Sequence, residues 1–301
     1  MKNLKHLHIR AGTFLALNSS VEAQNSISLN AELSLPQKNA KISEYIFKEK
    51  KISSDSANPT IYLIFQGHEN SEKEFTPDKA MSRMLAIENQ FSIYHILDYL
   101  YKEKQVRNVC SEGIFYNDSV DIVSPKLFNE KIHSTDNDFN NYFKETVYSL
   151  KQGDDLKFLN IFAATGMPAS QFFPFIYEDV FLTGFEDEKN TKFFEKMDYY
   201  IEHPERYTKK IEKELDSIFN ENFFLRSSDA ANYCLSNVNN LYNKKLIQDK
   251  NLAIVIGADH AGHYKKFALE IRDKKRDFNL TLIYPQGIQK YEKFVDYFGE
   301  Y

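Results

Sequence analysis

Residues 252–260 read LAIVIGADH, an apolar run that ends in a glycine and then in two polar residues. A short, uninterrupted apolar run predicts a strand that is buried on both faces, as strands of parallel sheets are. Residues 59–68, PTIYLIFQGH, follow a similar plan, with an apolar run between Pro59 and a glycine. The two stretches therefore predict two buried strands, each followed closely by a histidine.

The residues between these strands alternate in character along the chain. Apolar positions at helical spacing over 77–104 precede a second strand-like run at 106–110, and strand, crossover and strand form the parallel βαβ unit. Further helices are expected at 139–150, 156–176 and 262–273, and further strands at 180–183 and 280–284. The pattern predicts an α/β fold, a largely parallel central sheet flanked by helices, with a helical insertion in the middle of the chain.

The chain of 301 residues fits one large α/β domain with an insertion. Residues 1–58 are rich in polar residues and are interpreted as an irregular lead-in with one edge hairpin near 42–47. The single α/β domain is expected over 59–301, and it includes the helical insertion at about 190–248. The long helices of the insertion could cap a cleft or form an oligomer, and their pattern does not decide between these roles.

The N-terminus leaves the cellular location open. Basic residues precede a short apolar run at 11–17, and the sequence VEA at 21–23 resembles a cleavage site. A signal peptide over 1–23 would make the protein secreted or periplasmic, whereas a loosely ordered or strand-forming N-terminus would fit a cytoplasmic protein. No stretch reaches the ~20 apolar residues of a membrane helix, so no transmembrane segment is expected.

Charge and cysteine content narrow the function classes. A net charge of -5 gives no electrostatic reason to bind nucleic acid, and no nucleic-acid partner is expected. Two cysteines, Cys110 and Cys234, are too few for a disulfide framework or a cysteine zinc site. Cys110 lies in an apolar run and is interpreted as buried, and nothing in the local sequence favours a disulfide. His95, in an apolar helix stripe, is interpreted as a core histidine.

Polar residues follow three of the predicted strands. His68, Glu112 and the pair Asp259-His260 each come just after an apolar run. Ligands bind at the carboxyl edge of open α/β sheets, so these side chains are expected to meet there. Gly67 and Gly257 allow a tight turn and close backbone approach, and they leave backbone N–H groups to face a ligand.

The order of these features resembles the superfamily that joins the TraB and Tiki proteins, the erythromycin esterases and the ChaN haem-binding proteins. Its members carry two Gly-x-x-His motifs after strands, a Glu after the second strand, and an Arg in a helix before the last motif. Residues 257–260, GADH, match the second motif, Ser111-Glu112 matches the acid, and residues 225–231, LRSSDAA, resemble the Arg helix. Residues 65–68, FQGH, keep the histidine but have the glycine two places later.

This resemblance implies hydrolysis or ligand binding at the sheet edge. Tiki proteins look like metal-dependent proteases, erythromycin esterases hydrolyse an ester without metal, and ChaN binds haem. The leading hypothesis is a hydrolase of an ester or amide bond that acts on a small-molecule or peptide substrate. The alternatives are a ChaN-like protein that binds haem or a small ligand, and a catalytically degenerate interaction protein.

The resemblance and the residue chemistry together suggest a catalytic role for each candidate site residue. His68, Glu112 and His260 could hold a divalent Mn, Co or Zn ion, or one histidine could deprotonate water while Glu112 fixes its tautomer. Arg226 would stabilise an oxyanion, because a guanidinium keeps its charge at any working pH. Asp259 would orient His260 by a hydrogen bond. The structural alternatives are that Glu112 pairs with a neighbouring lysine and Arg226 with a nearby carboxylate.

Overall fold

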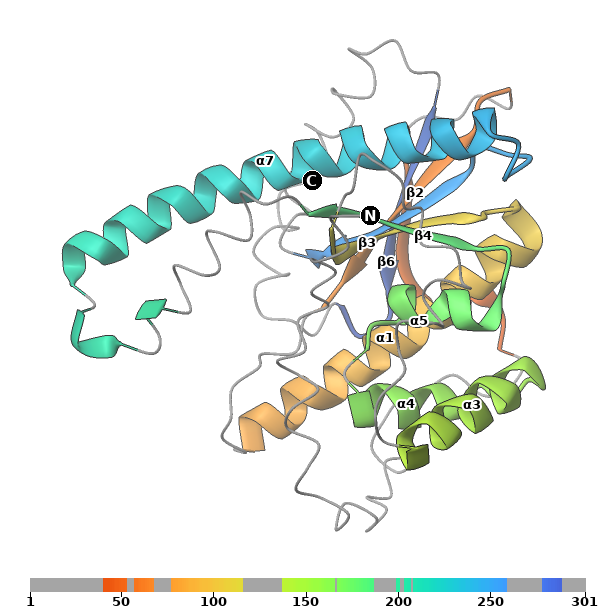
Figure 1. Cartoon of the computed structure of the whole chain (residues 1–301), viewed down its shortest axis with the longest axis horizontal. Helices are drawn as coiled ribbons and strands as arrows, with labels where there is room; N and C mark the ends of the chain where they lie inside the picture. Colours follow the sequence, from red (N-terminus) through yellow and green to blue (C-terminus); the bar gives the residue numbers. More distant parts are fainter. Residues whose placement is uncertain are drawn as a thin grey trace, which may run out of the picture.

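A computed structural model shows a mixed six-stranded sheet with helices packed on both faces (Figure 1). The strand order is β1-β6-β2-β5-β3-β4, in which β1 runs antiparallel to β6 and the other pairs are parallel. The structure describes residues 40–52, 57–67, 77–115, 137–165, 167–186, 199–200, 203–206, 208–258 and 278–288. The predicted α/β fold with a largely parallel central sheet is confirmed.

The elements have the following bounds. The strands are β1 (Ile46–Lys51), β2 (Thr60–Gln66), β3 (Asn108–Phe115), β4 (Phe181–Glu186), β5 (Leu252–Gly257) and β6 (Asn279–Pro285). The helices are α1 (Pro77–Lys104), α3 (Asn137–Lys151), α4 (Lys157–Thr165), α5 (Ala169–Ile176) and α7 (Lys209–Asn243), with short 3-10 turns η5 (Ile42–Glu44) and η6 (Pro204–Arg206). Every residue of β5 and β6 is buried, as expected of strands covered on both faces.

The lead-in, where an edge hairpin was predicted near 42–47, contributes the edge strand β1 to the sheet. β1 pairs with β6 at the edge of the sheet, so the sheet extends N-terminal of Pro59, where the α/β pattern was expected to begin. β1 reads IFKEKK, and charged residues on an edge strand oppose pairing with other chains. The candidate signal peptide at 1–23 and the predicted helix at 262–273 lie outside the described residues.

The helix predicted over 156–176 is two helices, α4 and α5. Pro168 precedes α5 in an extended conformation, with φ of -60° and ψ of 151°. A proline within a helix lacks the N–H that would bond to the preceding turn, and it disfavours helical backbone at the residue before it. The break brings the start of α5 to the sheet beside β3, where it contributes to the site described below.

The connections place helices on opposite faces. The chain moves along the sheet from β2 to β3 to β4, and then it returns to β5 and finally to β6. Right-handed crossovers that run in opposite directions lie on opposite faces of a sheet. Accordingly, α1, α3, α4 and α5 cover one face and α7 crosses the other (Figure 1). The long helix of the predicted insertion is thus the crossover between β4 and β5.

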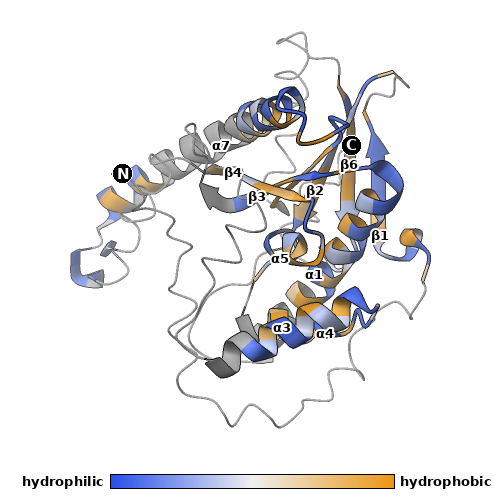
Figure 2. Cartoon of the chain, turned by 45° about the vertical axis from the view of Figure 1, so that its right-hand side comes forward, coloured by the Kyte–Doolittle hydropathy of each residue, from blue (hydrophilic) through white to orange (hydrophobic). Residues whose placement is uncertain are grey.

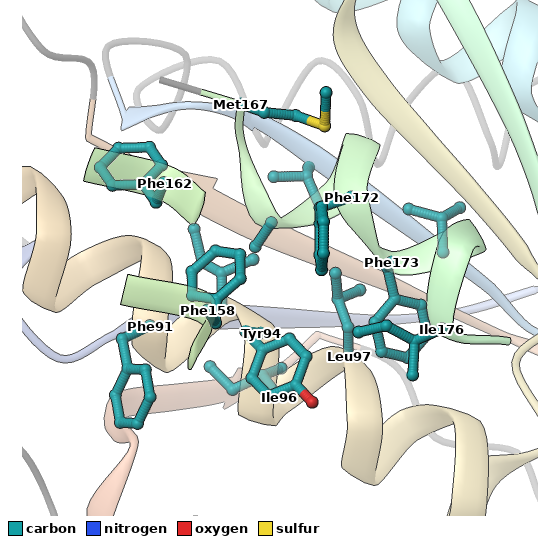
Figure 3. Close-up of a cluster of buried hydrophobic side chains, with 14 of the residues drawn as sticks. Phe91, Tyr94, Ile96, Leu97, Phe158, Phe162, Met167, Phe172, Phe173 and Ile176 are labelled. Carbon is teal, nitrogen blue, oxygen red and sulfur yellow. The ribbon is translucent and has the colours of Figure 1, made fainter. Parts of the chain in front are cut away.

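The two faces have different cores. The first is rich in aromatic rings from α1, α4 and α5, including Tyr94, which stacks on Phe158 with ring centroids 5.1 Å apart (Figure 3). The second packs mainly aliphatic side chains of the sheet, with fewer aromatic rings, against the C-terminal half of α7. In Figure 2 the central strands are largely hydrophobic, while hydrophobic and hydrophilic residues alternate on α3 and α4. Successive residues of β5, such as Ile254 and Val255, enter the two cores in turn.

His95 lies in the first core, as its position in an apolar stripe predicted. Its ring stacks on Tyr45 with centroids 4.1 Å apart, and its Nε2 lies 4.0 Å from an Asp155 oxygen. The buried Nε2 has no hydrogen-bond partner within the described part of the chain. Burial disfavours the charged ring and lowers the pKa of His95 to about 4.

This lowered pKa predicts acid sensitivity. Below the ordinary histidine pKa of 6.5 the unfolded chain gains a proton that the folded core excludes, so stability falls as pH drops from about 6.5 to about 4. Between pH 7 and 4.5, wild type should lose about 2 kcal/mol more of its unfolding free energy than His95→Phe. Urea unfolding at both pH values measures this difference, with His203→Gln, at a partly exposed histidine, as a control. An equal loss in wild type and His95→Phe would contradict the expectation.

Candidate active site

The centre of the sheet contains a topological switch point. β2 and β5 are parallel neighbours, and Gln66 at the end of β2 pairs with Gly257 at the end of β5. From β2 the chain crosses to β3, on the far side of β5, while from β5 it crosses to β6, on the far side of β2. Connections that leave neighbouring strands in opposite directions create a crevice at their carboxyl ends, and ligands bind there in open α/β sheets.

Glu112 lies beside this switch point. Backbone pairing between β3 and β5 ends at Ser111 and Val255, and beyond it the Glu112 Oε2 accepts a hydrogen bond from the Gly257 N–H at 2.6 Å. The prediction that Glu112 follows its strand is wrong in detail: β3 continues to Phe115 because it still pairs with β4. A carboxylate therefore takes the place of a β3 backbone acceptor, and hydrogen bonds to ionised acceptors are among the strong ones.

Asn89, in the middle of α1, joins the ends of two other strands. Its Oδ1 accepts a hydrogen bond from the Gly67 N–H at 2.8 Å, just after β2. Its Nδ2 donates to the Gln286 carbonyl at 3.3 Å, just after β6. Asn89 is fully buried, so these backbone groups are satisfied without water.

The neighbouring Gln90 and two serines attach α5 to the same edge. The Gln90 Nε2 donates to the Gln66 Oε1 at 3.3 Å, and its Oε1 accepts from the Ala169 N–H at 2.9 Å. The hydroxyl oxygens of Ser111 and Ser170 lie 2.8 Å apart. The first N–H of α5 is therefore bonded to protein, and the start of this helix is held against both β2 and β3.

The sequence contained a signal for this network that the prediction missed. Glu88-Asn89-Gln90 interrupts an otherwise apolar part of α1, and all three side chains are buried. Three consecutive helical positions span most of the circumference of a helix turn. Polar residues at all three positions of a buried helix must have hydrogen-bond partners inside the fold, so such a triplet indicates a polar site.

The structure brings together part of the predicted residue set. Gly67 directly follows β2, Glu112 lies on β3 and Gly257 ends β5, and all three lie at the same edge of the sheet. His68 and the Asp259-His260 pair lie outside the described residues. Arg226 lies within α7, in a helix as expected, and its side chain is outside the described part of the structure.

The metal hypothesis therefore rests on one described ligand candidate. Among the described residues, no three His, Cys, Asp or Glu side chains group together as a metal site. Glu112 supplies a carboxylate at the sheet edge, and the two imidazoles that would complete the predicted set belong to His68 and His260. A carboxylate held by a backbone N–H is oriented, which suits either a metal ligand or a group that orients a histidine.

The two cysteines are free and buried. The Cys110 sulfur lies 2.8 Å from the Thr183 hydroxyl oxygen, on the face of the sheet that α7 covers. Burial raises the pKa of the Cys234 thiol, and the neighbouring Cys110 thiol raises it further. Thiols in this environment are unreactive, which agrees with the interpretation of Cys110 as a core residue.

Comparison of the chain with protein-family models, curated proteins and solved structures gives no match. Every helix in the described ranges is too short or too polar to cross a membrane.

The bond between Glu112 and Gly257 predicts different effects for two substitutions. Glu112→Gln keeps an oxygen that accepts the Gly257 N–H, so its unfolding free energy should stay within about 1 kcal/mol of wild type. Glu112→Leu removes the acceptor and should cost about 1–3 kcal/mol. Urea unfolding at pH 7.5 measures both. Equal stability of the Leu and Gln variants would show that the bond contributes nothing to the fold.

Proposed function

We propose that the chain is a hydrolase of an ester or amide bond, with its active site at the carboxyl ends of β2, β5 and β3. The observation that carries the proposal is the Glu112 carboxylate bonded to the Gly257 N–H beside the switch point. This places an ionisable side chain of β3 where a ligand would enter an open α/β sheet.

The reach of the chain supports the inclusion of both histidines. His68 directly follows Gly67, so its Cα lies about 3.8 Å from the Gly67 Cα. His260 comes three residues after Gly257, and three residues span at most about 11 Å. Each histidine thus follows, within three residues, a glycine at the end of β2 or β5, and β5 is the neighbour of the strand that carries Glu112.

These residues can divide the work of hydrolysis. His68, Glu112 and His260 would hold a divalent Mn, Co or Zn ion, which when bound would supply a Lewis acid. Without a metal, one imidazole would take the proton from an attacking water while Glu112 holds that ring in the productive tautomer. Arg226 would stabilise the negative charge on the substrate oxygen, and Asp259 would orient His260.

The test combines metal content with hydrolysis. The full chain, His260→Ala and Glu112→Gln are exchanged into metal-free buffer and assayed after addition of Mn²⁺, Co²⁺ or Zn²⁺, with p-nitrophenyl acetate and a peptide p-nitroanilide as substrates. Glu112→Gln should fold, because it keeps the bond to Gly257 and loses only the charge. Both Glu112→Gln and His260→Ala should lose about 100-fold or more in activity. His203→Ala, at a partly exposed histidine outside the proposed site, serves as the control.

Each outcome has a clear meaning. Near-stoichiometric metal in wild type and its loss in His260→Ala would support the metal-dependent route and a peptide substrate. Activity without metal would support direct histidine catalysis. Full activity of His260→Ala would refute the proposal. The absence of hydrolysis combined with a Soret band on addition of haem would also refute it, in favour of a ChaN-like binding protein.

A further inference from the structure

Strand β3 changes its register at the position of Glu112. Ser111 pairs with Gly184 of β4. The next pair joins Phe115 to Glu186, so four steps along β3 face only two steps along β4. Extra residues of this kind form a β-bulge, which bends a strand and re-aims its side chains. Glu112 is the first residue of the bulge, and its carboxylate lies on a backbone N–H of β5, in the plane of the sheet.

A row of side chains holds the Glu112 peptide in this position. The Glu112 carbonyl accepts from the Ser111 hydroxyl at 3.1 Å and from the Gln171 Nε2 of α5 at 3.4 Å. A hydroxyl has one hydrogen, so Ser170 must be the donor in its 2.8 Å contact with Ser111. Both serines are fully buried, and the row therefore runs from α5 to Glu112 without water.

The row begins at a fixed part of the fold. The first N–H of α5, that of Ala169, bonds to the Gln90 side chain of α1. Phe172 and Phe173, on the next turn of α5, are buried in the aromatic core. Ser170 is thus held from both sides, and its hydroxyl can orient the Ser111 hydroxyl toward the Glu112 carbonyl.

We propose that Ser111, oriented by Ser170, is a positioning residue for Glu112. It holds the Glu112 peptide in the bulge and so keeps the carboxylate on the Gly257 N–H at the proposed site. The proposal rests on the proposed function, because it assigns the serine to the same reaction. The rival interpretation is that the two serines only stabilise the packing of α5 on the sheet.

Ser92 of α1 provides the matched control. It is also fully buried, and its hydroxyl donates to the Glu88 carbonyl of its own helix at 3.0 Å. Ser111→Ala and Ser92→Ala delete the same buried group, but only the first deletes a contact with Glu112. Ser111→Thr keeps the hydroxyl, and threonine is well suited to a strand.

The first measurement is exchange of the Gly257 amide hydrogen, followed by NMR in the full chain labelled with ¹⁵N-glycine, which contains 10 glycines. Ser111→Ala should accelerate this exchange about tenfold relative to Ser92→Ala, because the carboxylate leaves the N–H more often. Ser170→Ala, which leaves β3 unchanged, should accelerate it by about two- to fivefold. Ser111→Thr should restore the wild-type rate.

A double-variant cycle tests whether Ser111 acts through Glu112. In Glu112→Leu the acceptor of the Gly257 N–H is gone, so the further change Ser111→Ala should not accelerate exchange again. The second measurement is hydrolysis of p-nitrophenyl acetate. The kcat of Ser111→Ala should fall about tenfold or more with little change in KM, while Ser92→Ala and Ser111→Thr should stay near wild type.

The outcomes separate this proposal from the proposed function. Equal Gly257 exchange in Ser111→Ala and Ser92→Ala would overturn it, and so would a further acceleration in the Glu112→Leu background. An unchanged kcat in Ser111→Ala, with an active wild type, would also overturn it while the hydrolase stands. If wild type hydrolyses no substrate, the proposed function fails, and the exchange rates still decide whether Ser111 positions Glu112.

Discussion

The need to satisfy every buried backbone donor governs the carboxyl edge of this sheet. Where β3 stops pairing with β5, the Gly257 N–H would be left without an acceptor, and the Glu112 side chain supplies one. Where β2 ends, the Gly67 N–H also needs an acceptor, and the Asn89 side chain of α1 supplies it. The strands can separate at this edge without leaving unbonded polar groups, because side chains replace the missing backbone partners.

The helices that supply these partners are held by the first core. Aromatic rings of α1, α4 and α5 interlock beneath the sheet, so the buried amides of α1 are fixed relative to the strand ends. A rigid support is what a reactive site requires, because small misplacements of reacting groups cost much of the rate. The aromatic core therefore sets the positions of the helices, and hydrogen bonds from side chains of α1 and β3 then hold the carboxyl ends of the strands.

The sequence predicted the central strands because β2, β5 and β6 are apolar runs with sharp ends, and it predicted α1 with its bounds. It predicted an edge hairpin near 42–47 rather than the edge strand β1, because the exposed residues of IFKEKK carry little apolar pattern, and it missed the break at Pro168 within an otherwise apolar stretch. Glu112 was recognised because it follows an apolar run. Asn89 was missed although the polar triplet at 88–90 marks a polar site, and its backbone partners could not be named because they depend on tertiary contacts. The predicted roles of His68 and His260 stay predictions.

The strand order also governs how the chain can assemble. β5 lies between β2 and β3, and the Thr60 N–H at the start of β2 bonds to the Asn251 side chain, 191 residues away. During synthesis, the edges of β2 and β3 that face β5 must stay unpaired until the C-terminal part of the chain emerges. Sheets that depend on such distant pairing fold slowly and expose strand edges while they wait. A ribosome-bound chain truncated before β5 would thus be an open, aggregation-prone intermediate and a natural client for chaperones.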